Sequence, residues 1–402
     1  MIEPKLRFKA FSDELSHHTL MDIIVEKPSN GIMNRQSDKV TAVKHINVID
    51  MYTDDKIHVD ELSYSEYGDT AVEKCNVEIG DIFLTRSSVK ADGIAKSNIL
   101  LDDGIYVYDD HLIRLKVDKN NYIPEFVNDY LASPRFRRQF IVRAKTTAFT
   151  TIGQGDVASC TGDFPSLPEQ QKIAEFLSTI DTVIEKQKET VFAWEERKKG
   201  VMQKLFSQEV RFKADDGSEF PDWEEKKLGE VFTERTERSK GGESLLSVTI
   251  AQGIVKQSET DKRNIASENK SNYKIVKKND LAYNTMRMWQ GAEGVSEYDG
   301  IVSPAYTVIT ALDGNNSYFF EIMFKQTFML QVFQRFSQGL TSDTWNLKFP
   351  AFSEIKCLIP CEDEQNKIVE CVAVLDEVIE KQKAILAAWE ELKKGLLQQM
   401  FV

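Results

Sequence analysis

Long apolar runs, cysteine and histidine are all scarce in this sequence. No apolar run approaches the roughly 18 residues that a membrane-spanning helix needs. The N-terminal stretch MIEPKLRFKAFSDEL is charged from its third residue, so it does not resemble a signal peptide. The five cysteines are an odd number without a C-x-x-C pair. We therefore expect a reduced, cytoplasmic protein, and its 402 residues are enough for two or more domains.

Motifs for catalysis and for metal binding are missing as well. The sequence has no G-x-x-x-x-G-K-[ST] phosphate loop and no Pro-Pro pair of the kind that adenine methyltransferases use. All five histidines lie within the first 111 residues, far in sequence from Cys357, Cys361 and Cys371. This distance argues against a zinc site with mixed ligands. We predict no catalytic residues, no metal site and no cofactor in this chain.

The net charge of −13 argues mildly against a nucleic-acid partner, because phosphate binding requires cations. One segment departs from this balance. Residues 134–145, PRFRRQFIVRAK, carry five positive side chains and no acid, with Phe136 and Phe140 interleaved. By itself this pattern predicts an amphipathic helix with a solvated basic face. Composition therefore leaves the partner open.

An internal duplication is the strongest positive signal. Residues 169–206 and 364–401 align without a gap and share 21 of 38 residues, including VIEKQK and the W-E-E-x-K-K-G run that begins at Trp194 and Trp389. Chance would give only a couple of matches, so the two stretches are copies. Repeated helices between dissimilar segments suggest one kind of partner met twice and two different targets.

Each copy carries a heptad seam of a coiled coil, with apolar residues at alternating steps of four and three. The same two seam positions are polar in both copies, which fixes register at a cost in stability. A helix from Ile173 to Leu205 would be about 50 Å long, longer than the roughly 34 Å of one turn of B-DNA. A dimerisation coiled coil and a spacer are both possible, and so are parallel and antiparallel packing. The helix-packing residues that we predict are Ile173, Leu177, Ile180, Ile184, Gln187 and Trp194 in the first copy, and Ile368, Val372, Leu375, Ile379, Gln382 and Trp389 in the second.

The segments that precede the two helices share a plan but little sequence. Each opens with Arg-Phe-Lys-Ala (7–10 and 211–214) and continues with short β-like runs. In each, a helical stretch follows, over 124–140 and 318–336. We interpret them as two diverged copies of one mixed α/β domain. The predicted organisation is a first domain over 1–165, a helix over 166–207, a second domain over 208–362 and a helix over 363–402.

With this repeat, the chain resembles a type I restriction-modification specificity subunit along essentially all of its length. The most specific features are the paired Glu169-Gln170-x-Lys172-Ile173 and Glu364-Gln365-x-Lys367-Ile368, each followed by a long helix. The resemblance implies two target-recognition domains and two long helices that form an antiparallel coiled-coil spacer with pseudo-twofold symmetry. Each domain would read one half of a split, asymmetric site in double-stranded DNA.

The resemblance also implies partners that carry the chemistry. Two copies of a modification subunit would dock on the similar helices, bind S-adenosylmethionine and methylate adenine. Up to two restriction and translocase subunits could join, and ATP and Mg²⁺ are expected in the partner chains. The missing catalytic motifs fit this division of labour.

The resemblance does not identify DNA-contact residues, so we nominate them by type and placement. Arg, Asn and Gln can pair with base edges, whereas Lys, Ser and Thr mostly hold phosphates. Two loops in each domain are candidates, and Arg86, Arg287 and Gln290 are the residues we expect to read bases. The nominated set is Arg86, Ser87, Ser88, Lys90, Arg143, Lys145, Thr146 and Thr147 in the first domain, and Asn284, Arg287, Gln290, Ser337, Gln338, Thr341 and Ser342 in the second.

A scaffold whose coiled coil joins two protein-binding modules without DNA is the main alternative, and the acidic net charge favours it slightly. The alternative for each nominated residue is an ordinary solvated loop side chain. We expect Trp289 and Trp345 to belong to the core rather than to stack on bases.

Overall fold

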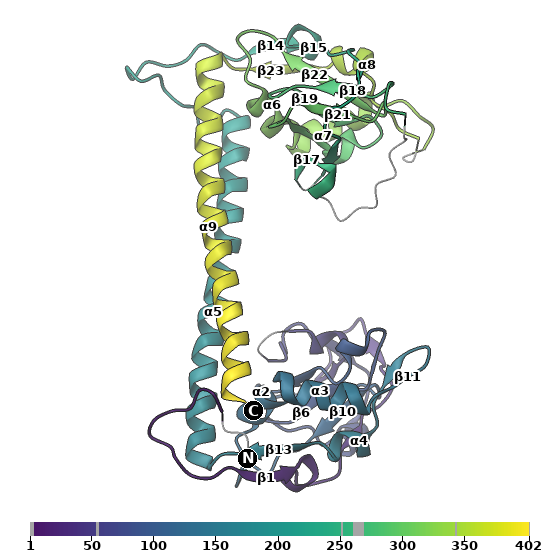
Figure 1. The fold of residues 1–402 in the computed structure, drawn as a ribbon, viewed down its shortest axis with the longest axis vertical. Helices are drawn as coiled ribbons and strands as arrows, with labels where there is room; N and C mark the ends of the chain where they lie inside the picture. Colours follow the sequence, from purple (N-terminus) through teal and green to yellow (C-terminus); the bar gives the residue numbers. More distant parts are fainter. Residues whose placement is uncertain (1–3, 54–55, 251, 260–268, 342–343, 402) are drawn as a thin grey trace. The chain divides into compact units, whose positions relative to one another are not determined.

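The computed structural model describes residues 4–401 except 54–55, 251, 260–268 and 342–343. The chain forms two compact units. Unit 1 contains residues 1–191 and 382–402, and unit 2 contains residues 192–381. Each of the two long helices, α5 (Leu167–Phe206) and α9 (Glu362–Met400), contributes one half to each unit (Figure 1). Within the described residues, no helix combines the length and the apolar character needed to cross a bilayer.

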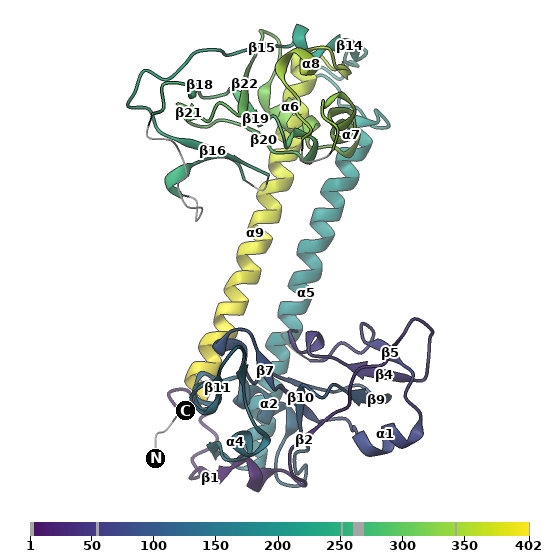
Figure 2. The same cartoon turned by 90° about the vertical axis from the view of Figure 1, so that its right-hand side faces the viewer.

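The described residues of unit 1 form two four-stranded sheets, a three-stranded sheet and a two-stranded ribbon. The sheet orders are β2-β10-β6-β8, β3-β5-β4-β9, β11-β12-β7 and β1-β13. Strands β3, β4, β5 and β9 and helix α1 group in one lobe (Figure 2). The elements are β1 (Ser16–Thr19), β2 (Ser29–Asn30), β3 (Gln36–Ser37), β4 (Val43–Ile46), β5 (Ser63–Ser65), α1 (Asp69–Cys75), β6 (Ile82–Thr85), β7 (Ser87–Ser88), β8 (Ser97–Ile99), β9 (Ile105–Tyr108), β10 (Leu112–Leu115), α2 (Pro124–Ala132), α3 (Pro134–Arg143), β11 (Lys145–Thr146), β12 (Thr150–Thr151), α4 (Gln154–Ala158) and β13 (Thr161–Phe164).

Unit 2 repeats the central part of this plan. Its four-stranded sheet has the order β15-β22-β19-β20, and the ribbon β14-β23 corresponds to β1-β13. Two further ribbons, β16-β17 and β18-β21, complete it. The elements are β14 (Glu224–Lys227), β15 (Phe232–Glu234), β16 (Leu246–Thr249), β17 (Gly253–Lys256), β18 (Lys274–Val276), β19 (Leu281–Asn284), η6 (Met288–Gln290), β20 (Glu293–Val295), β21 (Gly300–Val302), β22 (Tyr306–Ala311), α6 (Ser317–Phe324), α7 (Thr327–Phe336), α8 (Phe349–Ser353) and β23 (Lys356–Ile359).

In each unit one hydrophobic core runs from the sheet to the long helices. In unit 1 it joins Ile82 of β6, Phe126 of α2 and Leu177 of α5. In unit 2 the equivalent core includes Leu281 of β19 and Ile368 of α9. Each globular domain therefore shares its hydrophobic core with the long helices, because an apolar face of each helical half is buried against the domain of its own unit.

The arginine of each repeated Arg-Phe motif forms an ion pair with the glutamate of a repeated Glu-Gln motif, in the same way in both units. In unit 1, the Arg7 guanidinium makes two 2.7 Å hydrogen bonds to the buried carboxylate of Glu169 at the start of α5. In unit 2, Arg211 contacts Glu364 at the start of α9, at 3.1 and 2.7 Å. Trp223 Nε1 adds a third donor to Glu364 at 3.1 Å. These bidentate pairs explain why both motifs recur, since each arginine fixes the entry of a domain onto a helix.

The glutamines of the same motifs bind backbone. Gln170 Oε1 accepts the amide of Ile123, just before α2, at 3.0 Å, and its Nε2 donates to the carbonyl of Pro165 at 2.9 Å. Gln365 makes the matching contacts with Asn316 N (2.8 Å) and Pro360 O (2.9 Å). A buried amide that satisfies otherwise unpaired backbone groups is costly to replace.

The two long helices pack antiparallel. In unit 1, Gln187 Nε2 donates to Gln382 Oε1 at 2.8 Å, and Asp181 lies 2.5 Å from Lys393, so partner numbers fall along α9 as they rise along α5. In unit 2, Lys198 pairs with Asp376 at 2.5 Å. The two Lys–Asp pairs occupy the same positions of the repeat, as do the two glutamines. The polar seam residues thus contact one another, which confirms the predicted pseudo-twofold repeat and the antiparallel coiled coil. The helices and strands of both units confirm the mixed α/β class.

Burial along the seam is uneven. The predicted packing residues Ile173, Leu177, Ile180, Ile184, Ile368, Val372 and Ile379 are buried. Gln187, Trp194, Leu375, Gln382 and Trp389 are half-buried. The Arg197 guanidinium lies 5.3 Å from the centre of the Trp194 ring. The tryptophans therefore flank the seam rather than fill it, and their loss should cost less than the loss of a buried leucine.

The expected helical stretches are each broken into two helices. In unit 1 the break falls at Ser133, whose extended backbone precedes Pro134. Proline disfavours helical backbone in the residue before it and is favourable at the first turn of a new helix. In unit 2 helix α6 ends at Phe324 and α7 begins at Thr327. In each unit, one of the nominated loops follows the second of the two helices.

Candidate nucleic-acid interface

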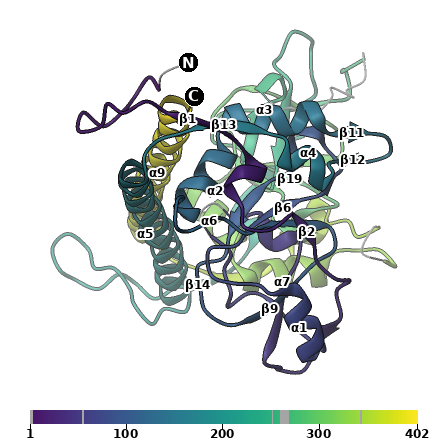
Figure 3. The ribbon, with the colours of Figure 1, turned by 90° about the horizontal axis from the view of Figure 1, so that it is seen from below.

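In unit 1 the two nominated loops form one small sheet. Strand β7, from the first loop, pairs with β12, which pairs with β11 from the second, in the register Thr150↔Ser88 and Thr151↔Ser87. The hairpin β11–β12 lies beside helices α3 and α4 (Figure 3). The sequence placed both loops after the correct elements, but their pairing could not be predicted because strands of two residues leave no periodic pattern.

The nominated side chains of unit 1 differ in how free they are. Arg86, Lys90, Lys145, Thr146 and Thr147 are exposed. The backbone of Arg86 is fixed, since its amide donates to His111 O at 2.8 Å and its carbonyl accepts from Ile152 at 3.0 Å. Ser87 and Ser88 are half-buried, and Ser88 Oγ accepts the Lys90 amide at 3.2 Å. Arg143 is half-buried, and its Nε lies 3.3 Å from Ser159 Oγ. Arg86 is therefore an exposed guanidinium on a rigid strand end.

The basic segment is less available to a partner than its charge suggests. Phe136 and Phe140 of α3 are buried, as predicted for an amphipathic helix. Arg135 pairs with Asp163 at 2.7 Å, and Arg137 donates to the carbonyls of Ala95 and Asp92, both at 2.6 Å. Burial lowers the pKa of Arg137. The expectation of a solvated basic face is thus only partly right, because two of its arginines support the fold.

In unit 2 the two nominated loops also meet. The Leu347 amide, beyond the second loop, donates to Thr285 O in the first at 2.8 Å. The rings of Trp289 and Trp345 pack edge to face with centroids 5.2 Å apart. Trp289 packs against the hydrophobic core, which agrees with the prediction, and Trp345 is half-buried. The tryptophan pair clamps one loop to the other.

The nominated residues of unit 2 again include one exposed arginine. Arg287, Gln338 and Thr341 are exposed, whereas Asn284, Gln290 and Ser337 are half-buried. Asn284 Oδ1 accepts the Met286 amide at 3.0 Å, and Ser337 Oγ donates to Phe333 O at 2.7 Å. These two side chains have structural partners. Ser342 lies outside the described residues.

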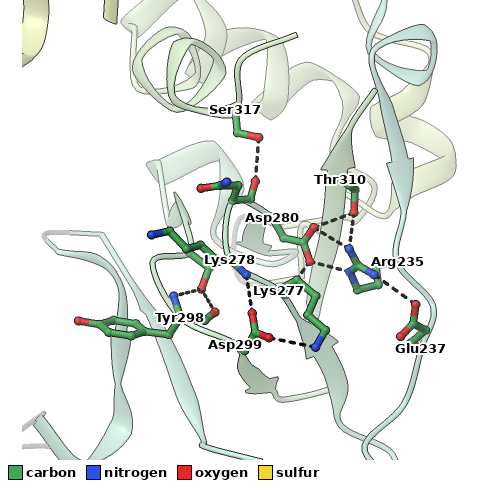
Figure 4. A network of polar contacts seen from close by, with 11 residues as sticks. Arg235, Glu237, Lys277, Lys278, Asp280, Tyr298, Asp299, Thr310 and Ser317 are labelled. Atoms are coloured by element: carbon green, nitrogen blue, oxygen red, sulfur yellow. Dashed lines mark hydrogen bonds and ion pairs between the residues drawn. The ribbon is translucent and has the colours of Figure 1, made fainter. Parts of the chain in front are cut away.

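A buried aspartate anchors the strand that carries the first loop in each unit. In unit 2, Asp280 precedes β19 and accepts from Arg235 (2.6 and 3.0 Å), from Thr310 Oγ1 at 2.7 Å and from the Lys277 amide at 2.7 Å (Figure 4). Three donors on one carboxylate fix the start of β19, and Asn284 at its end opens the loop. The strand is thus a rigid support for the candidate interface.

In unit 1 the matching Asp81 precedes β6, and its arginine comes from a different strand. Arg114 of β10 lies 3.5 Å from Asp81, and the Glu78 amide donates to the carboxylate at 3.0 Å. Burial raises the pKa of Asp81 to about 6, because these partners only partly offset its loss of hydration. Asp81 and Asp280 thus occupy the same position before the strand in the two units, but their arginine partners come from different places in the chain.

One group among the described residues has the donor types of a metal site. Carboxylate and imidazole atoms of Asp109, Asp110 and His111 lie within 4.8 Å of one another. His111 Nδ1 is 3.0 Å from Asp109 and 2.8 Å from Asp110. The contacts between an imidazole and two carboxylates explain this arrangement without an ion.

Comparisons with known proteins agree with this architecture. The family model described as "Type I restriction modification DNA specificity domain" matches residues 36–191 and 221–390. A curated relative, the predicted type I restriction enzyme MjaX specificity subunit of Methanocaldococcus jannaschii, is 28% identical over 217 residues, which cover 51% of this chain and 50% of the relative. This chain thus matches about half the length of that relative.

Two solved structures share the fold over nearly the whole chain. The S subunit of a type I restriction-modification system from M. genitalium has a TM-score of 0.56 and 16% identity, and the match covers 100% of this chain and 99% of the other. A chain from a study of complex assembly and conformational transition of the type I R-M system also has a TM-score of 0.56, with 13% identity and coverage of 96% and 97%. At these identities the likeness concerns the fold.

Proposed function

The chain belongs to the family of type I restriction modification DNA specificity domains, and from this premise we propose that it is the specificity subunit of a type I restriction-modification complex. It would read a bipartite, asymmetric target in double-stranded DNA and hold the other subunits on it. The observation that carries the proposal is the convergence of two loops in each unit, at the end of a strand anchored by a buried aspartate. Each pair presents an exposed arginine, Arg86 or Arg287, among hydroxyl and amide side chains.

This arrangement suits base readout better than electrostatic binding alone. Arginine pairs bidentately with guanine, and serine and threonine hydroxyls hold phosphates. The overall charge of −13 disfavours binding through phosphates alone. We infer that DNA binding is strongest in the assembled complex, where partner subunits add cations. The proposed recognition domains are 1–165 and 208–362, with the nominated residues of both as DNA contacts.

We further propose that the helices over 166–207 and 363–402 dock two copies of a methyltransferase subunit, with up to two restriction and translocase subunits joining. Apolar side chains outside the seam support a docking role: Val374, Ile385 and Leu392 of α9 are exposed. The matched positions of α5 hold Thr179, Thr190 and Arg197, so the two docking surfaces would be similar but not identical. The chain itself would hold no cofactor and catalyse no reaction. S-adenosylmethionine, ATP and Mg²⁺ would bind in the partners, in the cytoplasm.

The decisive experiment is long-read methylation sequencing of the host with and without the gene. We expect deletion to remove adenine methylation from one split, asymmetric motif and complementation to restore it. An unchanged methylome, with the neighbouring methyltransferase shown to be expressed, would reject DNA specificity. The coiled coil would then be a scaffold that joins two protein-binding modules.

A further inference from the structure

Two apolar side chains stand out at the tips of the second loops. Phe149, at the turn of the β11–β12 hairpin, is 55% exposed, and Leu340, in the loop after α7, is 100% exposed. The helices before them already supply the core with Phe136 and Phe140 in unit 1, and with Phe333 in unit 2. The tip residues are therefore not needed for packing, and water contact with them is unfavourable.

The tip of unit 1 is held in a defined turn. In unit 1 the Thr147 amide donates to Phe149 O at 3.0 Å, and the hydroxyls of Thr146 and Thr150 lie 3.0 Å apart across the hairpin. Strand β12 is then fixed to β7. An ordered turn displays its tip side chain with little further entropy to lose on binding.

In unit 2, other hydrogen bonds hold the described residues of the second loop. Gln338 and Asn346 exchange two backbone hydrogen bonds, at 3.0 and 2.8 Å. Thr344 Oγ1 donates to Thr341 O at 2.9 Å. Gly339 has a φ of +147°, and a Cβ there would lie 2.6 Å from the Thr344 carbonyl oxygen, so glycine is required. Leu340 follows this glycine directly.

In both units the loop after the second helix presents an apolar tip beside polar side chains, and Val89, Val142 and Phe336 nearby in sequence are exposed as well. Exposed Lys145, Thr146 and Thr147 precede Phe149, and exposed Gln338 and Thr341 surround Leu340. Arg335 of α7 is exposed before that loop. Each tip is a large apolar side chain beside hydroxyl, amide and cationic groups. This combination matches a DNA groove, where phosphates flank the thymine methyl.

We propose that Phe149 and Leu340 read thymine 5-methyl groups in the major groove, one in each half-site. This inference rests on the proposed DNA-binding function and adds specificity-determining residues to it. The exposed polar side chains beside each tip would hold the flanking phosphates. The tip side chain would bury the methyl group, which cytosine lacks.

The test combines protein and DNA changes in the assembled complex, once the methylome has given the target. Binding of wild type, Phe149→Ala and Leu340→Ala would be measured by anisotropy on the target duplex and on duplexes with each thymine replaced in turn by deoxyuridine, which lacks only the methyl. We expect one deoxyuridine position per half-site to weaken wild-type binding about fourfold, as for one buried methyl group. Each alanine variant should bind more weakly and be insensitive to deoxyuridine in its own half-site.

Val40→Ala and Leu312→Ala are matched controls, since both remove exposed apolar side chains outside the two second loops. They should bind like wild type, and thermal unfolding of all four variants should be unchanged. Additive effects of alanine and deoxyuridine, or a half-site without thymine, would overturn the proposal. It would equally fail if the alanine variants impaired subunit assembly but left DNA binding of the assembled complex unchanged. If wild-type complex selects no sequence at all, the proposed function itself fails, which is a distinguishable result.

Discussion

Among individual residues, the buried carboxylates at the starts of the long helices depend most on their charged partners. Glu364 is almost fully buried and accepts two hydrogen bonds from Arg211 and a third from Trp223. We expect Arg211→Ala to reduce the free energy of unfolding by about 3 kcal/mol, because an uncompensated charge stays buried. Thermal or chemical unfolding would measure the loss. Lys213→Ala, which removes an exposed pair with Glu219 (2.6 Å), should cost at most about 1 kcal/mol. If both variants lost the same free energy of unfolding, the Arg211–Glu364 ion pair would not have the stabilising role assigned to it.

Glu293 presents the opposite case, a carboxylate with little compensation. It is 0% exposed, neither oxygen has a hydrogen-bond partner among the described residues, and Lys325 lies 3.8 Å away. Burial raises the pKa of Glu293 well above its usual value, outweighing the attraction of Lys325. The folded protein therefore binds this proton more tightly than the unfolded chain, and stability falls as the pH rises above about 4.5.

We accordingly predict that Glu293→Gln raises the melting temperature of unit 2 by several degrees at pH 8 and by much less at pH 5. Lys325 keeps Glu321 as a partner at 2.7 Å, so it is not left alone. Melting curves across this pH range provide the measurement. The exposed Glu14 offers a control, since Glu14→Gln should leave the pH dependence unaltered. A gain that is independent of pH would show that Glu293 does not titrate in this range.

Arg86 and Arg287 are the residues for which we predict separable effects on specificity. Each lies on a different unit, so Arg86→Ala should relax recognition in one half-site and Arg287→Ala in the other, each by about 1–3 kcal/mol of discrimination. Methylome sequencing of strains that carry each variant would reveal which bases become degenerate. Loss of methylation without any relaxed motif would instead indicate a structural role.

At the scale of elements, the register of the two long helices depends on the Gln187–Gln382 pair, whose members occupy matching positions of the repeat. Replacing both with leucine should stabilise the coiled coil and weaken its register, since polar seam residues specify alignment at a cost in stability. We expect a higher melting temperature together with additional oligomers in light scattering. Exchanging both for asparagine serves as the polar control. A double leucine variant that is less stable than wild type would contradict this account.

What the sequence could predict follows from the length of its patterns. The long helices repeat an apolar period for ten seam positions, so their extent, packing residues and shared polar positions were all visible. The sheet β11-β12-β7 was not visible, because its strands have two residues each and β7 pairs with β12 across more than 50 positions. Orientation of the helices also required contacts such as Asp181–Lys393.

The nominated loops follow the elements that the sequence indicated, and their role in DNA binding stays a prediction. A strand followed by a turn can be recognised locally: Arg86 directly follows β6, and Arg287 lies three residues after β19. Nomination by polarity alone did not consider Phe149 and Leu340, whose apolar character is informative only once their exposure is known. It also included Ser337 and Asn284, whose side chains hold their own backbone. Exposure and local hydrogen bonding are set by tertiary structure and leave no signal in residue type.

For the whole molecule, we predict that the length of the antiparallel helices sets the spacing of the proposed half-sites. Each residue adds about 1.5 Å to a helix, and DNA rises about 3.4 Å per base pair. Seven residues preserve the heptad and so retain the seam on both sides of an insertion. One heptad in each helix should therefore lengthen the recognised spacer by about three base pairs.

The insertion belongs where the helices face each other, after Gln187 in α5 and before Gln382 in α9, so that every other seam contact retains its partner. Long-read methylation sequencing should then show both half-sites unchanged and the spacer between them longer. Inserting the heptad into α5 alone is the control, because mismatched helices cannot keep both Lys–Asp pairs and should fail to assemble. An unchanged spacer in a folded, active double-insertion variant would show that the partner subunits set the distance, and the spacer role of the helices would have to be abandoned.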